Sequence, residues 1–421
     1  MLIYLVFIFG YFTWQIIQKK NKAFNVLLAC AYFTGAEVFL RMTKAYFFYE
    51  VGKYSVIWFS LLGMFFLGFK RNSYPFLIYL LLLIPAILVS YDIISYDVNF
   101  RKSVLFNLSG PICLAIASVF IFGRTIRIDQ LLKVLDYMIY PMISMTTYII
   151  LYSPDIREVI TNTASNSAVS GGYGPNQVAT ILGLGVFILL TRLLIPYKNT
   201  LVQGVMMFFL VLMGYRALLT FSRGGVIAGV AMSIAFVIIL YFSTNLKYKA
   251  KISLKMLFLI AAALSIWAFA IFQTGGLIEN RYANEDALGR EKSDITTGRA
   301  ELLVAEIGAF KENPFLGVGV GRVKSHFEDE LGVSIATHNE ISRMLSEHGV
   351  FGIFALLVLI FTPLVTKLNG RKNIYFYPFL IFWGLTIAHS SMRIAAPAFI
   401  YALSLLNIDY DSKKKPALHR K

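Results

Sequence analysis

The chain has 421 residues, of which 57% are hydrophobic and only 15% are charged. Soluble domains carry about 25% charged residues, so this composition excludes the soluble enzyme classes and indicates an all-α polytopic membrane protein. The two cysteines, Cys30 and Cys113, lie inside apolar runs. We interpret both as small buried hydrophobic side chains, because their spacing suggests neither a disulfide framework nor a metal cluster.

A membrane-spanning helix needs about 20 mainly apolar residues, and the chain offers about thirteen such stretches. In chain order they are 2–18, 23–40, 54–69, 74–91, 104–123, 131–152, 177–196, 201–219, 225–243, 254–273, 349–365, 374–389 and 394–408. The last is short and contains Pro397, so we expect it to be half-buried or kinked. The first has no basic segment before it and is followed by lysines, which is typical of an uncleaved anchor with its N-terminus outside. We predict one integral membrane domain, 1–421, with about 12 or 13 spans.

The net charge of +16 follows from the topology. If the basic tail 409–421 is cytoplasmic and the sides alternate backwards, more than half of the 39 basic residues fall in inner segments, and nearly all of the 23 acidic residues fall outside. This is the positive-inside pattern. Because membrane topology accounts for the positive charge, this charge is no evidence for nucleic-acid binding. We therefore predict membrane lipids and no nucleic acid as partners.

Two outer segments are too long to be simple turns. The smaller covers 153–176, and the larger covers 274–348. Within the larger one, apolar residues recur at helical spacing from Thr297 to Phe310, which predicts a short amphipathic helix against the outer membrane face. A second helix is expected to carry Asn339 to Glu347 into the next span.

The larger outer segment ends with a histidine next to a membrane span. A neutral imidazole at His338 could accept a proton from a hydroxyl near neutral pH; the alternative is a capping or surface histidine. His338 and His348 are ten residues apart and form no metal-binding motif, and the Glu328-Asp329-Glu330 run is typical of a solvated face. We therefore predict no metal and no cofactor.

Three arginines are candidates for binding an anion near the outer interface. Arg223 lies in a very short outer turn between two apolar stretches, and Arg216 lies about two helical turns earlier. An arginine at that depth needs a partner, which is either a phosphate or a protein carboxylate such as Glu37. Arg299, at the start of the predicted loop helix, could supply a third cation, where helix N-terminal amides also favour an anion.

A glycine-rich stretch at residues 317–322 resembles a nucleotide-binding loop only superficially. It has no third glycine at the spacing that the dinucleotide-binding motif requires. We expect these glycines to allow tight backbone packing or close approach to a ligand.

Several short motifs together resemble the bacterial O-antigen ligase and O-antigen polymerase superfamily over roughly residues 170–365. In order, they are Gly-Pro-Asn at 174–176, Phe-Ser-Arg-Gly at 221–224, Gly-Arg at 298–299, Asn-Pro-Phe-Leu-Gly-Val-Gly at 313–319, His-Asn at 338–339 and Glu-His-Gly at 347–349. The motifs are individually short, and their order, spacing and sidedness carry the resemblance. The family's ligases usually have twelve spans with the N-terminus inside, whereas we count thirteen with the N-terminus outside.

The resemblance implies a glycosyltransferase of C-type architecture in the bacterial inner membrane, active on the periplasmic face. It implies that His338 is the general base and that Arg223 and Arg299 hold the pyrophosphate of an undecaprenyl-pyrophosphate-linked glycan, with Arg216 a weaker candidate. We expect Ser222, Asn339 and Glu347 to support the site.

The resemblance leaves the acceptor open. We lean towards an O-antigen ligase that transfers the glycan to a hydroxyl of the lipid A-core oligosaccharide, without metal and with inversion. The alternative is a repeat-unit polymerase of O-antigen or exopolysaccharide with a growing glycan as acceptor. A lipid-linked glycan transporter is a remoter alternative, because the spans contain few ionisable residues.

Overall fold

The computed structural model describes residues 1–93, 100–195, 199–292, 299–323, 327–328 and 337–410. Most of the predicted basic tail and most of the acidic run at 328–330 lie outside the described residues. The predicted all-α polytopic fold is confirmed. Each of the apolar stretches overlaps a helix: α1 Leu2–Gln18, α2 Lys22–Met42, α3 Val51–Leu67, α4 Tyr74–Ile93, α5 Phe100–Ile121, α6 Ile128–Tyr152, α8 Pro175–Leu194, α9 Thr200–Leu219, α10 Arg223–Phe242, α11 Leu246–Gln273, α15 Glu340–Leu368, α16 Phe376–Ser390 and α17 Ala395–Ser404.

Nine helices among the described residues are long and apolar enough to cross a membrane. The other four overlapping helices, α1, α3, α16 and α17, are shorter. Helix α17 has ten residues, all of them buried, so the prediction of a half-buried segment was wrong. Pro397 lies in its first turn, where the N–H that proline lacks would have no partner within the helix, and the helix forms without an internal break.

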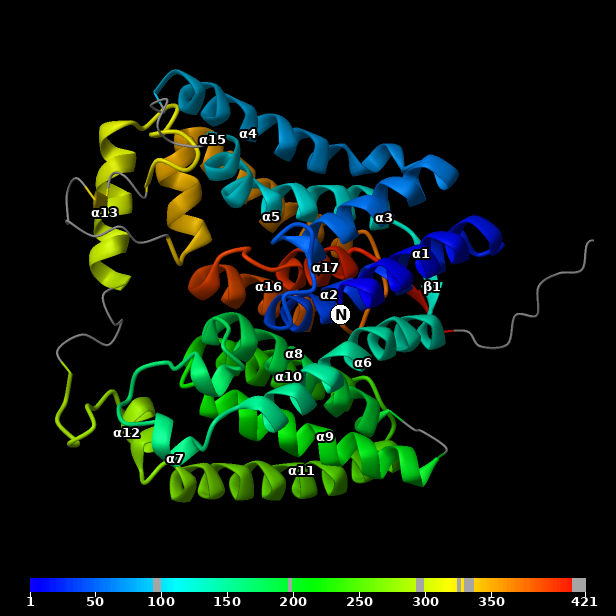
Figure 1. Cartoon of the computed structure of the whole chain (residues 1–421). Coiled ribbons are helices and arrows are strands. Elements are labelled where there is room, and N and C mark those ends of the chain that lie inside the picture. Colours follow the sequence, from blue (N-terminus) through cyan, green and yellow to red (C-terminus); the bar gives the residue numbers. More distant parts are fainter. Residues whose placement is uncertain (94–99, 196–198, 293–298, 324–326, 329–336, 411–421) are drawn as a thin grey trace, which may run out of the picture.

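The helices run between two ends of the molecule (Figure 1). At one end, β1 (Thr125–Arg127) and β2 (Asn407–Asp409) form a two-stranded parallel sheet in which Ile126 pairs with Ile408. This sheet was not predicted. At the other end lie α7 (Ile156–Val159), α12 (Leu277–Ala283) and α13 (Arg299–Glu312). The described helices of the two long outer segments therefore lie at the same end of the bundle.

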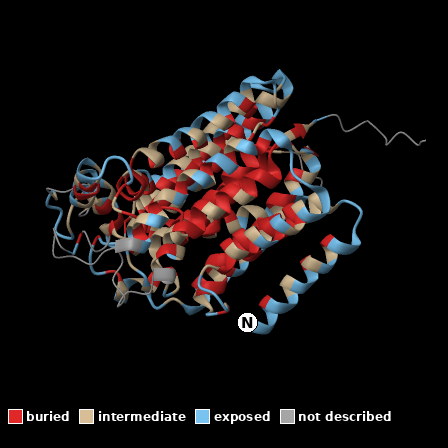
Figure 2. Ribbon diagram, turned by 90° about the horizontal axis from the view of Figure 1, so that it is seen from above, coloured by how far each residue is buried: buried red, intermediate tan, exposed pale blue. Residues whose placement is uncertain are grey.

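The buried residues concentrate in the central helices, while α1 at the edge is mostly exposed (Figure 2). Helix α2 packs against α3 and α6, α10 packs against α8 and α16, and α17 packs against α5 and α16. Helices α16 and α17 thus lie in the interior and connect the two halves of the bundle. The loop between them, at the end opposite the sheet, is tied to α2, because the Glu37 carboxylate accepts a hydrogen bond from the backbone N–H of Ala395 (2.5 Å) and pairs with Arg41.

Helix α13 confirms the helix predicted in the larger outer segment. Ala305, Glu306 and Ala309 are its buried residues, and the helix packs against α15. Leu303 and Ile307, which belong to its apolar spacing pattern, are exposed. Small residues allow the two helices to approach closely, so the larger apolar side chains face away from this contact.

The predicted second helix is also confirmed, since α15 runs from Glu340 into the next apolar stretch. It is kinked at Gly349, which has φ +58°. A Cβ at this position would collide with the backbone of Pro314 and Phe315, because it would lie only about 2.6 Å from their carbonyl oxygens. Glycine is therefore required both for the left-handed conformation and for the close approach of the preceding loop.

Candidate active site

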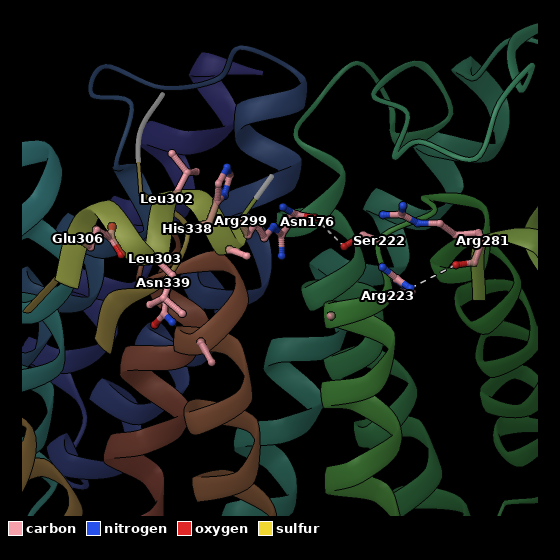
Figure 3. Close-up of a pocket in the computed structure, with 13 residues that line it drawn as sticks. Asn176, Ser222, Arg223, Arg281, Arg299, Leu302, Leu303, Glu306, His338 and Asn339 are labelled. Carbon is pink, nitrogen blue, oxygen red and sulfur yellow. Dashed lines mark hydrogen bonds between the residues drawn. The ribbon is translucent and has the colours of Figure 1, made fainter. Parts of the chain in front are cut away.

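A pocket of about 330 Å³ lies at the end of the bundle that carries α12 and α13 (Figure 3). This volume is in the range of small-molecule sites. Its lining comes from six helices or the residues just before them, far apart in the sequence. The lining residues are Asn176, Ser222, Arg223, Gly224, Arg281, Arg299, Ala300, Leu302, Leu303, Glu306, His338, Asn339 and Ala388.

Arg223 is placed by the tight turn between α9 and α10. It is the first residue of α10, and Phe221 before it adopts a positive φ of 56°. Ser222 at the start of α10 donates a hydrogen bond from Oγ to Oδ1 of Asn176 (2.7 Å), near the start of α8. The predicted Phe-Ser-Arg-Gly and Gly-Pro-Asn motifs therefore meet in one wall of the pocket.

Arg281 brings a further guanidinium to this wall. It lies on α12, where its Nε donates to the backbone carbonyl of Phe221 (3.0 Å), and its own carbonyl accepts a hydrogen bond from Arg223 (3.4 Å). Burial lowers the pKa of Arg281, and the neighbouring positive charges of Arg223 and Arg299 lower it further. Burial and Arg223 also lower the pKa of Arg299.

The three guanidinium groups line the same pocket, so their like charges oppose one another there. Among the described residues, neither Arg281 nor Arg299 has a carboxylate within ion-pair distance. A bound dianion or trianion would relieve this repulsion, because arginine side chains bind phosphate oxygens through paired N–H donors. The chemistry of this wall is therefore compatible with a phosphate-bearing ligand.

His338 lies directly before α15 and faces the same pocket. Burial lowers the pKa of His338 to about 4, and the positive charges of Arg393 and Arg299 and the nearby His389 contribute to this shift. The imidazole is therefore neutral at physiological pH and can accept a proton. The next residue, Asn339, caps α15 by accepting a hydrogen bond from the N–H of Ile341 (2.9 Å).

Arg216 is not among the residues that line the pocket. Its side chain is buried and donates to the backbone carbonyl of Ile149 at the end of α6 (3.0 Å). The alternative ion pair with Glu37 is not formed either, because that carboxylate pairs with Arg41. The structure therefore brings Arg223 and Arg299 together and leaves Arg216 apart from them.

Glu347 also lies away from the pocket lining. It is buried in α15, pairs with Arg343, and accepts a hydrogen bond from the N–H of Gly321 (2.8 Å). The glycine stretch 317–322 is further held by the N–H of Val318, which donates to the carbonyl of Ser346 (2.8 Å). These glycines therefore allow the backbone to pack tightly against α15. Glu347 stabilises this packing.

Arg281 and Glu306 were not singled out from the sequence. Arg281 belongs to a helix of seven residues in the outer segment, which has no apolar run to mark its position. Glu306 is charged, and a charged residue on an amphipathic helix normally faces solvent. Within the described ranges, no three His, Cys, Asp or Glu side chains are grouped so that they could hold a metal ion.

Residues 208–357 match the family model described as O-Antigen ligase. The predicted resemblance to the O-antigen ligase and polymerase superfamily is confirmed. The matched region begins in α9 and ends within α15, and it contains Arg223, Arg281, Arg299 and His338. No curated protein matches the chain.

The family match supports a function of the ligase or polymerase type and a role as an enzyme. The apolar helices together with the family match indicate a multi-pass membrane protein. Lipid-linked glycans are the substrates that the O-antigen ligase family implies.

Proposed function

We propose that this protein is a glycosyltransferase that transfers a glycan from undecaprenyl pyrophosphate to a sugar hydroxyl on the periplasmic face of the bacterial inner membrane. The observation that supports it most is the shared pocket: a neutral histidine and three arginines, from helices α10, α12 and α13 and the start of α15, line one cavity. The base and the cations that this reaction needs are therefore close enough to act on one substrate.

The proposed chemistry is a single displacement. His338 accepts the proton of the acceptor hydroxyl, whose oxygen forms a bond to the anomeric carbon of the glycan. The bond from that carbon to the pyrophosphate oxygen breaks, and the electron pair leaves with the undecaprenyl pyrophosphate. Arg223, Arg281 and Arg299 stabilise the negative charge that develops on this leaving group. Attack opposite the leaving group inverts the anomeric configuration, and neither metal nor nucleotide takes part.

In this proposal Arg281 is the third arginine that binds the pyrophosphate, a role for which the sequence had suggested Arg216. Arg281 is preferred because it contacts Arg223 and lines the pocket. Ser222 and Asn339 support the site by fixing Asn176 and the first turn of α15.

The preferred form of the reaction is ligation to the lipid A-core oligosaccharide, and repeat-unit polymerisation is the alternative with the same chemistry. A transfer assay on the purified full chain in detergent, with EDTA present, separates the two. The donor is an undecaprenyl-pyrophosphate glycan, supplied with and without a lipid A-core acceptor, and products are resolved on a gel.

A single shifted band that depends on the acceptor supports the ligase. A ladder that forms without the acceptor supports the polymerase. The absence of product in both lanes, with added divalent metal also failing to produce any, contradicts the proposed transferase and favours transport.

A further inference from the structure

The pocket lining includes a carboxylate, Glu306, that the proposed reaction does not use. It lies two turns after Arg299 in α13, and only 2% of its surface is exposed. Its Oε2 accepts a hydrogen bond from the hydroxyl of Ser342, whereas Oε1 has no hydrogen-bond partner among the described residues. The Thr337 hydroxyl nearby donates to the carbonyl of Asn339 instead (3.2 Å).

An unpaired carboxylate oxygen in a buried position is costly, because it has lost its water without gaining a donor. No ion pair within the described part of the chain includes Glu306. The cost is removed if a ligand brings a hydroxyl or another donor to Oε1. Burial also raises the pKa of Glu306, while the hydrogen bond from the Ser342 hydroxyl and the positive charge of Arg343 lower it.

The pocket is divided by charge. Figure 3 shows Arg223 and Arg281 at one end, Glu306 and Asn339 at the other, and His338 with Arg299 between them. The cationic end suits the pyrophosphate of the donor. The acidic end lies beyond the base, on the side from which a hydroxyl would approach, and Leu302 and Leu303 give it apolar surface.

We propose that Glu306 and Asn339 form an acceptor subsite, in which Oε1 of Glu306 binds a hydroxyl of the acceptor sugar next to the one that His338 deprotonates. This inference rests on the proposed function. A sugar hydroxyl suits the position because it can donate to a carboxylate. An ionised phosphate oxygen cannot donate, and its charge is repelled, so the acceptor sugar carries no phosphate beside the reacting hydroxyl.

The subsite is tested by steady-state kinetics of the full chain with the acceptor that is active in the transfer assay, either the lipid A-core oligosaccharide or a repeat-unit glycan. Glu306→Gln keeps the size of the side chain and removes its charge. We expect the KM for the acceptor to rise about tenfold or more, while the KM for the donor stays within about twofold of the wild-type value. Glu301→Gln is the matched control, because Glu301 is an exposed glutamate on the same helix outside the pocket lining.

A second variant separates acceptor binding from a merely structural role. If Glu306 serves only to hold the first turn of α15 through Ser342, then Ser342→Ala will reproduce the whole effect, and the donor and acceptor KM values will change together. That result overturns the inference, as does an acceptor KM that is unchanged in Glu306→Gln. If Glu306→Gln does not fold, Glu306→Asp is measured instead, because it keeps the charge but has a shorter side chain. The KM for the acceptor and the KM for the donor are then compared in the same way.

The two proposals fail in different ways. A wild-type protein that transfers glycan to neither acceptor contradicts the proposed function itself. A wild-type protein that is active, with variants that bind the acceptor normally, contradicts the acceptor subsite alone.

Discussion

Arg393 donates a hydrogen bond to the backbone carbonyl of Thr337, the residue that precedes His338. Arg393 lies in the loop between α16 and α17, and Arg41 of α2 donates to its backbone carbonyl (3.3 Å). The interior of the bundle is thus connected to the segment that carries the proposed base. Arg393 also affects the histidine electrostatically, since its positive charge contributes to the lowered pKa of His338.

We predict that Arg393 acts as a positioning residue. Arg393→Gln should lower kcat about tenfold to a hundredfold, because a small displacement of the base has a large effect on proton transfer. It should also raise the pKa of His338, because a neighbouring positive charge is removed. The acidic limb of the pH–rate profile then moves to higher pH. Arg290→Gln, at an exposed arginine of the outer segment, is the control; an identical profile for both variants would contradict the positioning role.

The pH dependence of the wild-type protein follows from the same shift. Because the pKa of His338 is lowered to about 4, the neutral base is present above that pH and is lost only as the pH falls through it. The plot of kcat/KM, which reports the free enzyme, should therefore be flat from about pH 8 to about pH 5.5 and decline below. A limb near the ordinary histidine pKa of 6.5 in kcat/KM would contradict this expectation.

Arg281 and Arg216 provide a matched pair of arginines. Arg281→Gln removes a cation from the pocket, so kcat/KM for the donor should fall about tenfold or more. Arg216→Gln removes a buried hydrogen bond to the carbonyl of Ile149, so it should lower the thermal stability and leave the donor kcat/KM of the folded protein within about threefold. The reverse assignment of the two effects would show that Arg216 is the residue that binds the pyrophosphate.

Gly224 tests the packing beneath the site. A Cβ there would overlap the imidazole ring of His389 in α16, and Gly224 is next to Arg223. Gly224→Ala should destabilise the protein by about 1–3 kcal/mol through overpacking and reduce turnover. Gly384→Ala, in the same helix as His389, meets no atom within 4 Å and should leave thermal melting and activity nearly unchanged. Equal melting temperatures of the two variants would contradict this packing.

The helices could be predicted from the sequence because most apolar stretches are long enough to leave little alternative to a membrane helix. The position of Arg216 could not be predicted, because helix geometry alone does not say which neighbour a side chain faces. In the structure, α9 turns Arg216 towards α6. The pairing of β1 with β2 joins residues 125–127 and 407–409, and no local pattern indicates a contact across that distance.

The candidate site was predictable only in part. His338, Arg223 and Arg299 lie at motif positions in predicted outer segments, so their common end of the bundle followed from sidedness. Arg281 and Glu306 reach the pocket through the fold of the outer segment, where two short helices, α12 and α13, place them. Their burial depends on tertiary packing, which residue type and spacing do not reveal.

The central claim is that His338 accepts the acceptor proton in a pocket where arginines bind the donor. The most direct test is a comparison of wild type with His338→Ala in two measurements, donor binding and single-turnover transfer. We predict that His338→Ala binds the undecaprenyl-pyrophosphate glycan with unchanged affinity but transfers it at least about a hundredfold more slowly. Normal transfer by His338→Ala would contradict this claim.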